Sequence, residues 1–229
     1  MTETGADQAT DAAETDGIRF DREGRLGRII LDRPKALNSL TQAMCAAVHR
    51  HLDRWADDDS VGVVLVTGDG GKAFCAGGDV VRVAKDAAAG GDHWWRFFQA
   101  EYRMNHAISR FPKPYISWLD GITMGGGFGI SAHGGYRVAT PKTLFAMPET
   151  GLGLIPGEAG GHFLPRCPGR LGLYLALTGY RCDAADSLYC GYATHHLPSE
   201  AFGAVLDELA HGRDGVDAVL ARHASETKA

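Results

Sequence analysis

The amino-acid sequence predicts an α/β protein with a largely parallel sheet, and three observations support this. A strand-like run over residues 61–67 is followed by the glycine turn 76–79 and then by a helix-like stretch from Val80. The same order recurs where the strand-like run 115–119 leads into the glycine turn 124–127. Both runs are apolar almost throughout, which is typical of parallel strands that are buried on two faces.

Further strands and helices are predicted on either side of these two units. Residues 18–20 and 28–31 favour strands around a turn at Glu23 and Gly24. Residues 42–55 have apolar side chains at helical spacing, and Ser39 and Thr41 before them are candidate N-caps. The later predictions are a helix over 93–110, a helix over 128–132, strands over 136–139 and 144–146, and helical stretches over 159–166, 171–177, 184–190, 202–209 and 216–229.

Composition and charge exclude several classes of function. The 229 residues carry a formal net charge of -5 with no run of Lys or Arg, which argues against nucleic-acid binding. No apolar stretch reaches the roughly 18 residues that a membrane helix needs, and no signal-peptide pattern opens the chain. The 5 cysteines are scattered without metal-binding spacing. We therefore expect a cytoplasmic protein with reduced cysteines, no metal and no membrane contact.

The two glycine turns are candidate anion-binding sites, because the first N–H groups of a helix lack intrahelical partners. Two such turns that converge on one carbonyl oxygen would form an oxyanion hole, which indicates chemistry through an enolate or a tetrahedral thioester adduct. Asp79 is predicted to cap the helix that begins at Val80. Cys75 is interpreted as a buried core residue, since no histidine is near it in sequence. The histidines show neither metal nor triad spacing, and we expect none to be catalytic.

Three motifs in order resemble the enoyl-CoA hydratase/isomerase (crotonase) superfamily. They are residues 33–40 (RPKALNSL), 72–79 (KAFCAGGD) and 121–127 (GITMGGG). Within that superfamily the chain looks most like the 3-hydroxyisobutyryl-CoA hydrolases, on segments 97–102, 121–127, 137–140, 144–150 and 163–166. The resemblance implies a spiral of ββα repeats with C-terminal helices, and it implies an acyl-CoA as the bound partner.

Three regions follow from this resemblance and from composition. Residues 1–16 have only acidic charges and no large apolar residue after Met1, so we expect a disordered acidic tail. Residues 17–200 are predicted to form the crotonase-like acyl-CoA-binding core. Residues 201–229 are predicted to form a partial helical region, and we expect the chain to stop before the natural end of the fold. The family suggests a homo-oligomer, but the subunit number stays open.

The resemblance also implies substrate contacts in the two turns. The thioester oxygen would be held by the backbone N–H groups of Ala76 and Gly126. The neighbouring substrate-binding positions are Gly77, Gly125 and Asp79, and the adenosine part would lie near Lys35 and Ala36. No metal or redox cofactor is implied, and CoA enters only as part of the substrate.

Two glutamates receive roles from their motif positions. Glu149, after the Met-Pro pair, would be the main catalytic carboxylate, acting as general base on water or as nucleophile through a mixed anhydride. Apolar neighbours such as Phe145 and Leu152 would raise its pKa. Glu101 would orient the substrate hydroxyl or the water.

Two departures from the family pattern bear on the reaction. Hydratases carry their first catalytic glutamate two positions after the glycine turn, and Gly129 stands there in this chain, which disfavours hydration by two carboxylates. The hydrolases usually carry Asp after a proline, whereas Pro156 is followed here by Gly157 and then Glu158. Either Glu158 takes over as a second catalytic carboxylate, or that role is lost.

The resulting hypothesis is an acyl-CoA thioester hydrolase that converts 3-hydroxyisobutyryl-CoA to 3-hydroxyisobutyrate and CoA, a step of valine catabolism. Two alternatives stay open. One is an enoyl-CoA hydratase or isomerase that works with Glu149 alone, and the other is an inactive acyl-CoA binder or truncated homologue.

Overall fold

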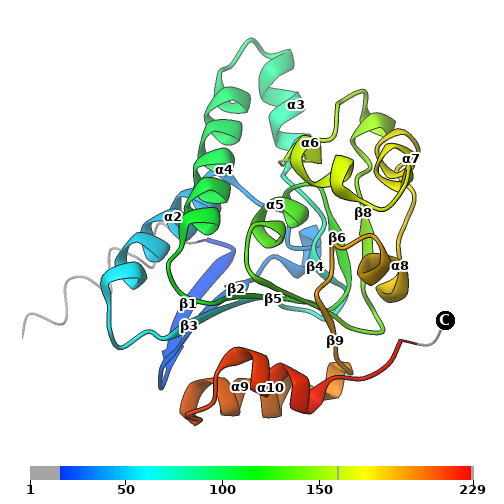
Figure 1. Ribbon diagram of the computed structural model, residues 1–229. Helices are drawn as coiled ribbons and strands as arrows, with labels where there is room; N and C mark the ends of the chain where they lie inside the picture. The colour runs from blue at the N-terminus through cyan, green and yellow to red at the C-terminus, as the bar shows by residue number, and fades with distance from the viewer. Residues whose placement is uncertain (1–15, 159, 228–229) are drawn as a thin grey trace, which may run out of the picture.

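The larger sheet follows the order β1-β2-β3-β5-β7-β9 (Figure 1) in the computed structural model, which describes residues 16–158 and 160–227. Strands β1 and β2 form an antiparallel hairpin, and every later neighbour is parallel. The strands are β1 (Ile18–Glu23), β2 (Leu26–Leu31), β3 (Val63–Gly68), β5 (Tyr115–Leu119), β7 (Tyr136–Ala139) and β9 (His195–His196).

A smaller parallel sheet provides the edge at which the candidate site lies. It has the order β4-β6-β8, with β4 (Ala73–Cys75), β6 (Ile122–Met124) and β8 (Leu144–Ala146). The first glycine turn follows β4, the second follows β6, and Pro148 comes shortly after β8. Because the carboxyl ends of parallel strands meet at one edge of a sheet, this topology brings together three segments that are far apart in sequence.

Helices cover both faces of the larger sheet. Helices α2 (Gln42–Asp57), α4 (His93–Arg110) and α5 (Gly126–Ala132) lie on one face, and α9 (Phe202–His211) and α10 (Val216–His223) on the other (Figure 1).

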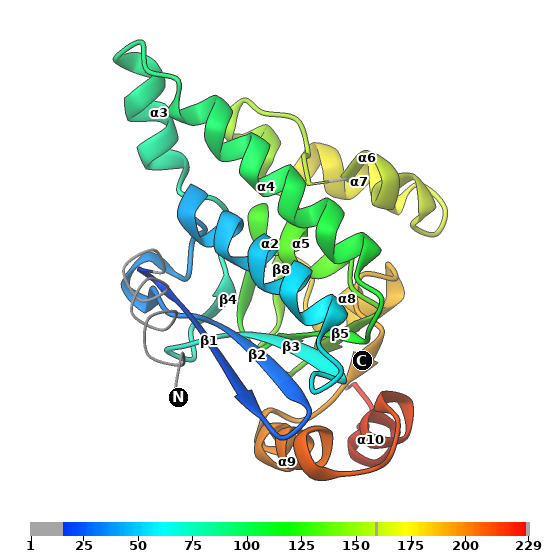
Figure 2. The ribbon, with the colours of Figure 1, turned by 90° about the vertical axis from the view of Figure 1, so that its left-hand side faces the viewer.

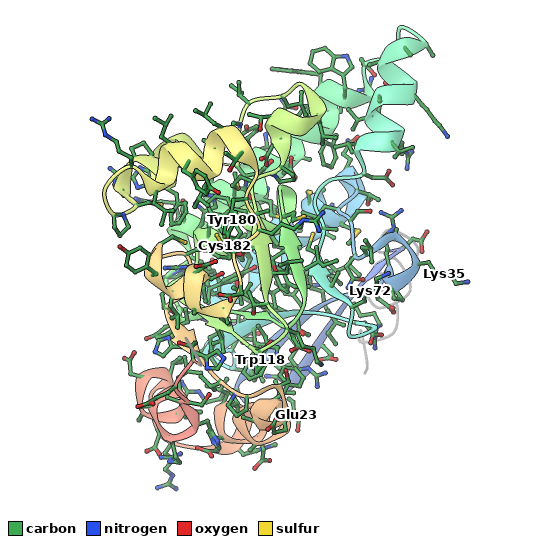
Figure 3. All side chains as sticks on the ribbon, turned by 90° about the vertical axis from the view of Figure 1, so that its right-hand side faces the viewer. Glu23, Lys35, Lys72, Trp118, Tyr180 and Cys182 are labelled. Carbon is green, nitrogen blue, oxygen red and sulfur yellow. The ribbon has the colours of Figure 1, made fainter. Side chains whose placement is uncertain are left out.

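The position of strand β3 explains why the strand-like run over residues 61–67 is apolar almost throughout, because the side chains on both faces of the strand are buried. Val64 and Val66 face the core under α2 and α4, while Val63 and Leu65 face the core under α9 and α10. On that second face, the ring of Trp118 packs on Phe202 of α9, with 5.0 Å between ring centroids (Figure 3).

Helices α3, α6, α7 and α8 complete the helical part of the chain. Figure 2 shows α3 (Val80–Ala88) at one end of α4, and α6 (Gly160–Phe163) and α7 (Leu171–Thr178) on the side away from α2. Helix α8 (Ala184–Tyr189) precedes β9. Short 3-10 helices complete the chain: η1 (Pro34–Ala36), η2 (Glu149–Leu152), η3 (Leu164–Arg166) and η4 (Ser199–Ala201). No helix among the described residues is long and apolar enough to cross a membrane.

The predicted α/β class is confirmed, and the helix over 93–110 and the strands at 115–119, 136–139 and 144–146 match the structure. Two predicted helices were too long. The last one ends at His223 instead of continuing to the chain end, and the stretch after 159 divides into α6 and η3. Pro165 at the start of η3 cannot donate a backbone hydrogen bond, which ends the α-helix. The predicted tail lies, except for Asp16, outside the described residues.

Candidate active site

The two glycine turns lie against each other at the edge of the smaller sheet. A Cβ atom placed on Gly127 would be 2.1 Å from the carbonyl oxygen of Cys75, and one on Gly126 would be 3.0 Å from the amide nitrogen of Gly78. Glycine is required at both positions because the backbone of the first turn occupies the space of a side chain. The two turns are therefore packed directly against each other and form one structural unit.

The segment before α2 fixes the orientation of the first turn. The N–H of Ala76 donates to the carbonyl of Leu37 at 3.0 Å, so it is already engaged within the fold. Leu40 then bonds on both sides of Gly78, donating to the carbonyl of Gly77 at 2.8 Å and accepting from the N–H of Asp79 at 2.9 Å. In an extended chain the peptide groups alternate in direction, so the N–H of Gly78 points away from this segment.

These bonds correct the expectation that Ala76 supplies a free amide. The N–H of Gly78 has no backbone acceptor among the described residues, and it faces Gly126. Gly126 is the first residue of α5, so its N–H has no partner within the helix. Gly78 and Gly126 therefore present free amides at the point where the two turns meet.

Three carboxyl groups from separate elements meet beside these amides. Glu101 comes from α4, Glu149 opens η2, and Glu158 lies in the loop before α6. Their exposed fractions are only 1%, 8% and 6%. All three line one cavity of about 620 Å³, together with the glycine turns and the apolar residues Val80, Trp94, Trp95, Phe97, Phe98, Leu152, Leu154 and Ile155. No Lys, Arg or His is among the described residues that line it.

The apolar stripe of α4 explains why Glu101 points inward. Phe97, Glu101, Met104, Asn105 and Ile108 form the buried face of the helix, at helical spacing. Sequence reasoning gave Glu101 a role only through its family motif, and it missed Asn105. The spacing from Phe97 and Ile108 is the signal that could have found both residues.

Glu149 is buried without a partner. Pro148 is the N-cap residue of η2, and neither carboxyl oxygen of Glu149 has a hydrogen-bond partner among the residues that the structure describes. A Cβ atom on Gly125 would lie 3.6 Å from Oε1 of Glu149, which puts this carboxyl beside the second glycine turn. Burial raises the pKa of Glu149, and the charge of Glu158 raises it further.

Glu158 is held by polar contacts in a conformation that is unusual for glutamate. Its φ of 54° lies in the left-handed region, and the side-chain amide of Asn105 donates to Oε2 at 2.5 Å. Burial raises the pKa of Glu158, although hydrogen bonds from Glu101 and Asn105 favour its ionised form. Burial and the nearby charge of Glu158 raise the pKa of Glu101 well above its ordinary range.

Other predicted contact residues lie outside the cavity. Asp79 caps α3 by accepting from the N–H of Arg82 at 3.3 Å, and it pairs with Arg33 at 3.1 Å. Lys35 is exposed on η1, and its side chain points outward at the edge of the molecule (Figure 3). Ala36 is half-buried on the same short helix. Neither of these η1 residues lines the cavity.

Other reactive side chains have surroundings that suppress reactivity. Cys75 is fully buried, and burial raises its pKa to about 12, so it remains a thiol. Burial lowers the pKa of His133 at the end of α5. Across the described part of the chain, no group of three His, Cys, Asp or Glu could hold a metal ion.

A parallel sheet whose glycine turns meet beside a buried carboxyl cavity defines the crotonase class of α/β proteins. The chain belongs to the enoyl-CoA hydratase/isomerase family, whose sequence model matches residues 26–229.

Relatives with curated names point to one branch. The mitochondrial 3-hydroxyisobutyryl-CoA hydrolase of Danio rerio is 48% identical over 84% of this chain and 50% of its own length. The protein of the same name from Homo sapiens is 42% identical over 96% of this chain and 57% of its own length. The chain thus spans about half the length of these relatives.

Solved structures share the fold. A carnitinyl-CoA dehydratase from Mycobacterium thermoresistibile superimposes with a TM-score of 0.88 at 46% identity, covering 94% of this chain and 63% of that one. An enoyl-CoA hydratase from Rhodobacter sphaeroides 2.4.1 gives a TM-score of 0.82 at 38% identity, covering 87% and 59%.

Proposed function

We propose that the chain is an acyl-CoA thioester hydrolase that converts 3-hydroxyisobutyryl-CoA, or a similar short 3-hydroxyacyl-CoA, to the free acid and CoA. The observation that carries the proposal is the unpartnered carboxyl of Glu149, buried beside the free amides of Gly78 and Gly126. Relatives named 3-hydroxyisobutyryl-CoA hydrolase support the substrate.

The amides of Gly78 and Gly126 would form the oxyanion hole. The thioester carbonyl oxygen would accept a hydrogen bond from each, and these bonds strengthen as the oxygen becomes negative in the tetrahedral adduct. The apolar lining of the cavity increases this stabilisation, because hydrogen bonds to a charged oxygen are stronger where the local dielectric constant is low. A backbone donor is also fixed before the substrate arrives, so little reorganisation is needed.

Glu149 would act on water as general base. The water oxygen bonds to the thioester carbon while its proton passes to Glu149. Collapse of the adduct breaks the carbon–sulfur bond, and the CoA thiolate takes up a proton as it leaves. The raised pKa of Glu149 makes it a stronger base than an exposed glutamate, at the cost of some ionisation near neutral pH.

Nucleophilic attack by Glu149 is the other route. Its carboxylate would bond to the thioester carbon and expel the CoA thiolate, leaving a mixed anhydride that water then hydrolyses. Trapping with hydroxylamine during turnover distinguishes the two routes, because only the anhydride gives a hydroxamate on Glu149.

Thiol release from 3-hydroxyisobutyryl-CoA, followed with a thiol-reactive dye, tests the proposal. The native chain should turn over, and Glu149→Gln should not. Glu200→Gln is a matched control, since Glu200 is exposed on η4 outside the cavity. No thiol release from folded native chain would refute the hydrolase and leave acyl-CoA binding without turnover.

A specific observation favours a hydratase as second candidate. A Cβ atom on Gly129 would lie 2.4 Å from Oε2 of Glu158, so a carboxylate from another segment fills the space that Gly129 leaves open. With Glu149, it could supply the two carboxylates that hydration needs. Loss of enoyl absorbance from crotonyl-CoA without thiol release would select this function.

Cytoplasmic localisation and a homo-oligomer remain predictions.

A further inference from the structure

The peptide group between Gly77 and Gly78 carries one of the free amides of the site, and its own residues do not fix its direction. Neither residue has a Cβ atom, and Gly77 has a φ of 125°, so this peptide can rotate with little steric cost. The C=O and N–H of a trans peptide point in opposite directions. A half-turn would present the carbonyl oxygen of Gly77 to the cavity in place of the N–H of Gly78, and it would repel a thioester oxygen there. Contacts from other residues have to hold the N–H inward.

The carbonyl of Gly77 accepts from two donors that do not line the cavity. The N–H of Leu40 donates to it at 2.8 Å, and the thiol of Cys75 donates to it with 3.6 Å between sulfur and oxygen. Burial raises the pKa of Cys75 to about 12, so the sulfur keeps the proton that it donates. Both bonds hold the carbonyl in place, and they also polarise the peptide, which makes the N–H of Gly78 a stronger donor.

A charge pair holds the two segments together beside this peptide. Leu40 and Gly78 form an isolated parallel bridge, and Arg33 joins the residues on either side of that bridge. The guanidinium of Arg33 donates to the carbonyl of Ser39 at 2.7 Å and to Oδ2 of Asp79 at 3.1 Å. The side chains of Arg33 and Asp79 are only 26% and 23% exposed, so solvent screens their attraction less than it screens a surface pair.

The segment that carries Arg33 is itself anchored to the ends of two strands. Asn38 is fully buried, and its side-chain amide donates to the carbonyls of Asp69 at 2.9 Å and Ala73 at 2.8 Å. Its Oδ1 accepts from the backbone N–H of Arg33 at 2.9 Å. Arg33 therefore pulls on Asp79 from a fixed position.

We propose that Arg33 and Cys75 are positioning residues that keep the N–H of Gly78 directed at the thioester oxygen. The inference rests on the proposed function, because it takes this N–H as an oxyanion donor. It makes Asp79 the anchor of Arg33, in place of the substrate contact that the family resemblance implies. It also gives the buried thiol of Cys75 a use as a hydrogen-bond donor.

The carbonyl stretch of a bound substrate analogue reports the direction of this N–H without any turnover. The analogue is the dethia form of 3-hydroxyisobutyryl-CoA, with a methylene in place of the thioester sulfur and an isotopic label in the carbonyl carbon, measured by infrared difference spectroscopy. Binding to the native chain should move the stretch to lower wavenumber, because both amides donate to the oxygen. Arg33→Ala should lose about half of this shift, since one of the two donors is no longer held in place.

Two further variants separate the charge pair from the stability of the fold. Lysine keeps the attraction to Asp79, so Arg33→Lys should recover about half of the lost shift. Asparagine still caps α3 by accepting from the N–H of Arg82, but it does not attract Arg33, so Asp79→Asn should reproduce the loss with α3 intact. A full native shift in both Arg33→Ala and Asp79→Asn would overturn the role of Arg33.

Arg222→Ala is the matched control. It removes an arginine that pairs with two carboxylates on the far side of the larger sheet, so the carbonyl shift should stay at its native value. An equal loss of the shift in Arg222→Ala and Arg33→Ala would mean that general destabilisation is responsible, and it would overturn the role of Arg33.

The thiol is tested with two substitutions that remove the same sulfur. Cys75→Ala also removes the donor, so kcat for thiol release should fall about threefold and the carbonyl shift should decrease. Cys75→Ser keeps an O–H donor, and its kcat should stay within about twofold of the native value. Because both variants lose the packing of the sulfur, a difference between them reports the hydrogen bond. Equal values in the two variants would overturn the role of Cys75.

Steady-state kinetics give a second readout for Arg33. Arg33→Ala should lower kcat for thiol release about tenfold and leave KM within about twofold, because the N–H bond strengthens as charge develops on the oxygen. A raised KM with unchanged kcat would mean that Arg33 supports only substrate binding, and it would contradict the proposal.

Failure of this inference is distinguishable from failure of the proposed function. A carbonyl shift that depends on Arg33, without thiol release from the thioester, would sink the hydrolase and leave the positioning role standing. Thiol release with the same carbonyl shift in native chain and Arg33→Ala would do the opposite. If the analogue does not bind to the native chain, or binds without a carbonyl shift, Gly78 is not an oxyanion donor and the inference is wrong.

Discussion

Carboxylates gather at two places in this molecule, in opposite surroundings. In the cavity, Glu101, Glu149 and Glu158 are buried with no basic side chain among the described lining residues. On the far side of the larger sheet, Glu208 and Asp214 pair with basic groups near the surface. Arg222 bonds to both, at 2.6 Å for Asp214, and His223 lies 2.7 Å from Glu208.

The difference appears in the pKa shifts. The hydrogen bond from His223 is the largest cause that holds the pKa of Glu208 below its ordinary value. Burial raises the pKa of each cavity carboxyl instead. A paired surface carboxylate adds a little stability, whereas an unpaired buried one costs stability and gains basicity. The contrast indicates that the cavity carboxyls are retained for chemistry, and four predictions test it.

The largest expected effect is on the rate. Glu149→Gln should lower thiol release about 10³-fold, since it removes the base or nucleophile. It should not lower the melting temperature, because no hydrogen bond to either carboxyl oxygen is lost. Parallel thiol assays and thermal unfolding measure both quantities. A variant that loses stability along with activity would show that Glu149 supports the fold. The comparison between cavity carboxyls that serve chemistry and surface carboxylates that serve stability would then be wrong.

The second effect concerns the amides beside the carboxyls. Gly126→Ala should lower thiol release about 10²-fold, because the new Cβ would lie 2.6 Å from Oε1 of Glu101 and 3.0 Å from the nitrogen of Gly78. Gly203→Ala is the matched control, since a Cβ there meets nothing within 4 Å in α9. Equal activity of the two variants would show that Gly126 has no role in thiol release.

The third prediction is the sign of the pH dependence of stability. A carboxyl whose folded pKa is raised contributes stability below its unfolded pKa of about 4.3, and that contribution is lost as pH rises through the folded pKa. Glu101→Gln should therefore gain stability relative to the native chain between acidic and neutral pH, by about 1.4 kcal/mol for each unit of the raised pKa. Urea unfolding at several pH values measures this, and a constant difference would contradict the shift.

The smallest effect is expected in the paired cluster. Arg222→Ala should lower the melting temperature slightly and leave thiol release unchanged, since α10 lies across the larger sheet from the cavity (Figure 1). Glu208 should act with the opposite sign to Glu101, losing its contribution as pH falls through its lowered pKa. High salt should reduce the effect of Arg222→Ala, because these charges are partly exposed. An effect that is unchanged by salt would mean that packing is responsible.

Local sequence indicated most of the elements and the motifs. Alternation of apolar strands with amphipathic helices indicated the α/β class, and Asp79 was identified as a helix cap from its position alone. Such features depend on neighbours within a few residues, so periodicity and capping chemistry report them directly. The family resemblance added Glu149 and Glu101, because periodicity and capping chemistry give neither residue a role.

Only the tertiary structure decided which groups meet. The choice of Gly78 over Ala76 as the free amide depends on hydrogen bonds to residues 37–40, a separate segment of the chain. The position of the Glu158 carboxyl depends on a left-handed backbone and on Asn105, which lies one turn after Glu101 on α4. The direction of an amide N–H and the burial of a carboxyl group are set by contacts with residues that lie far away in sequence. For that reason the sequence alone could not determine either one.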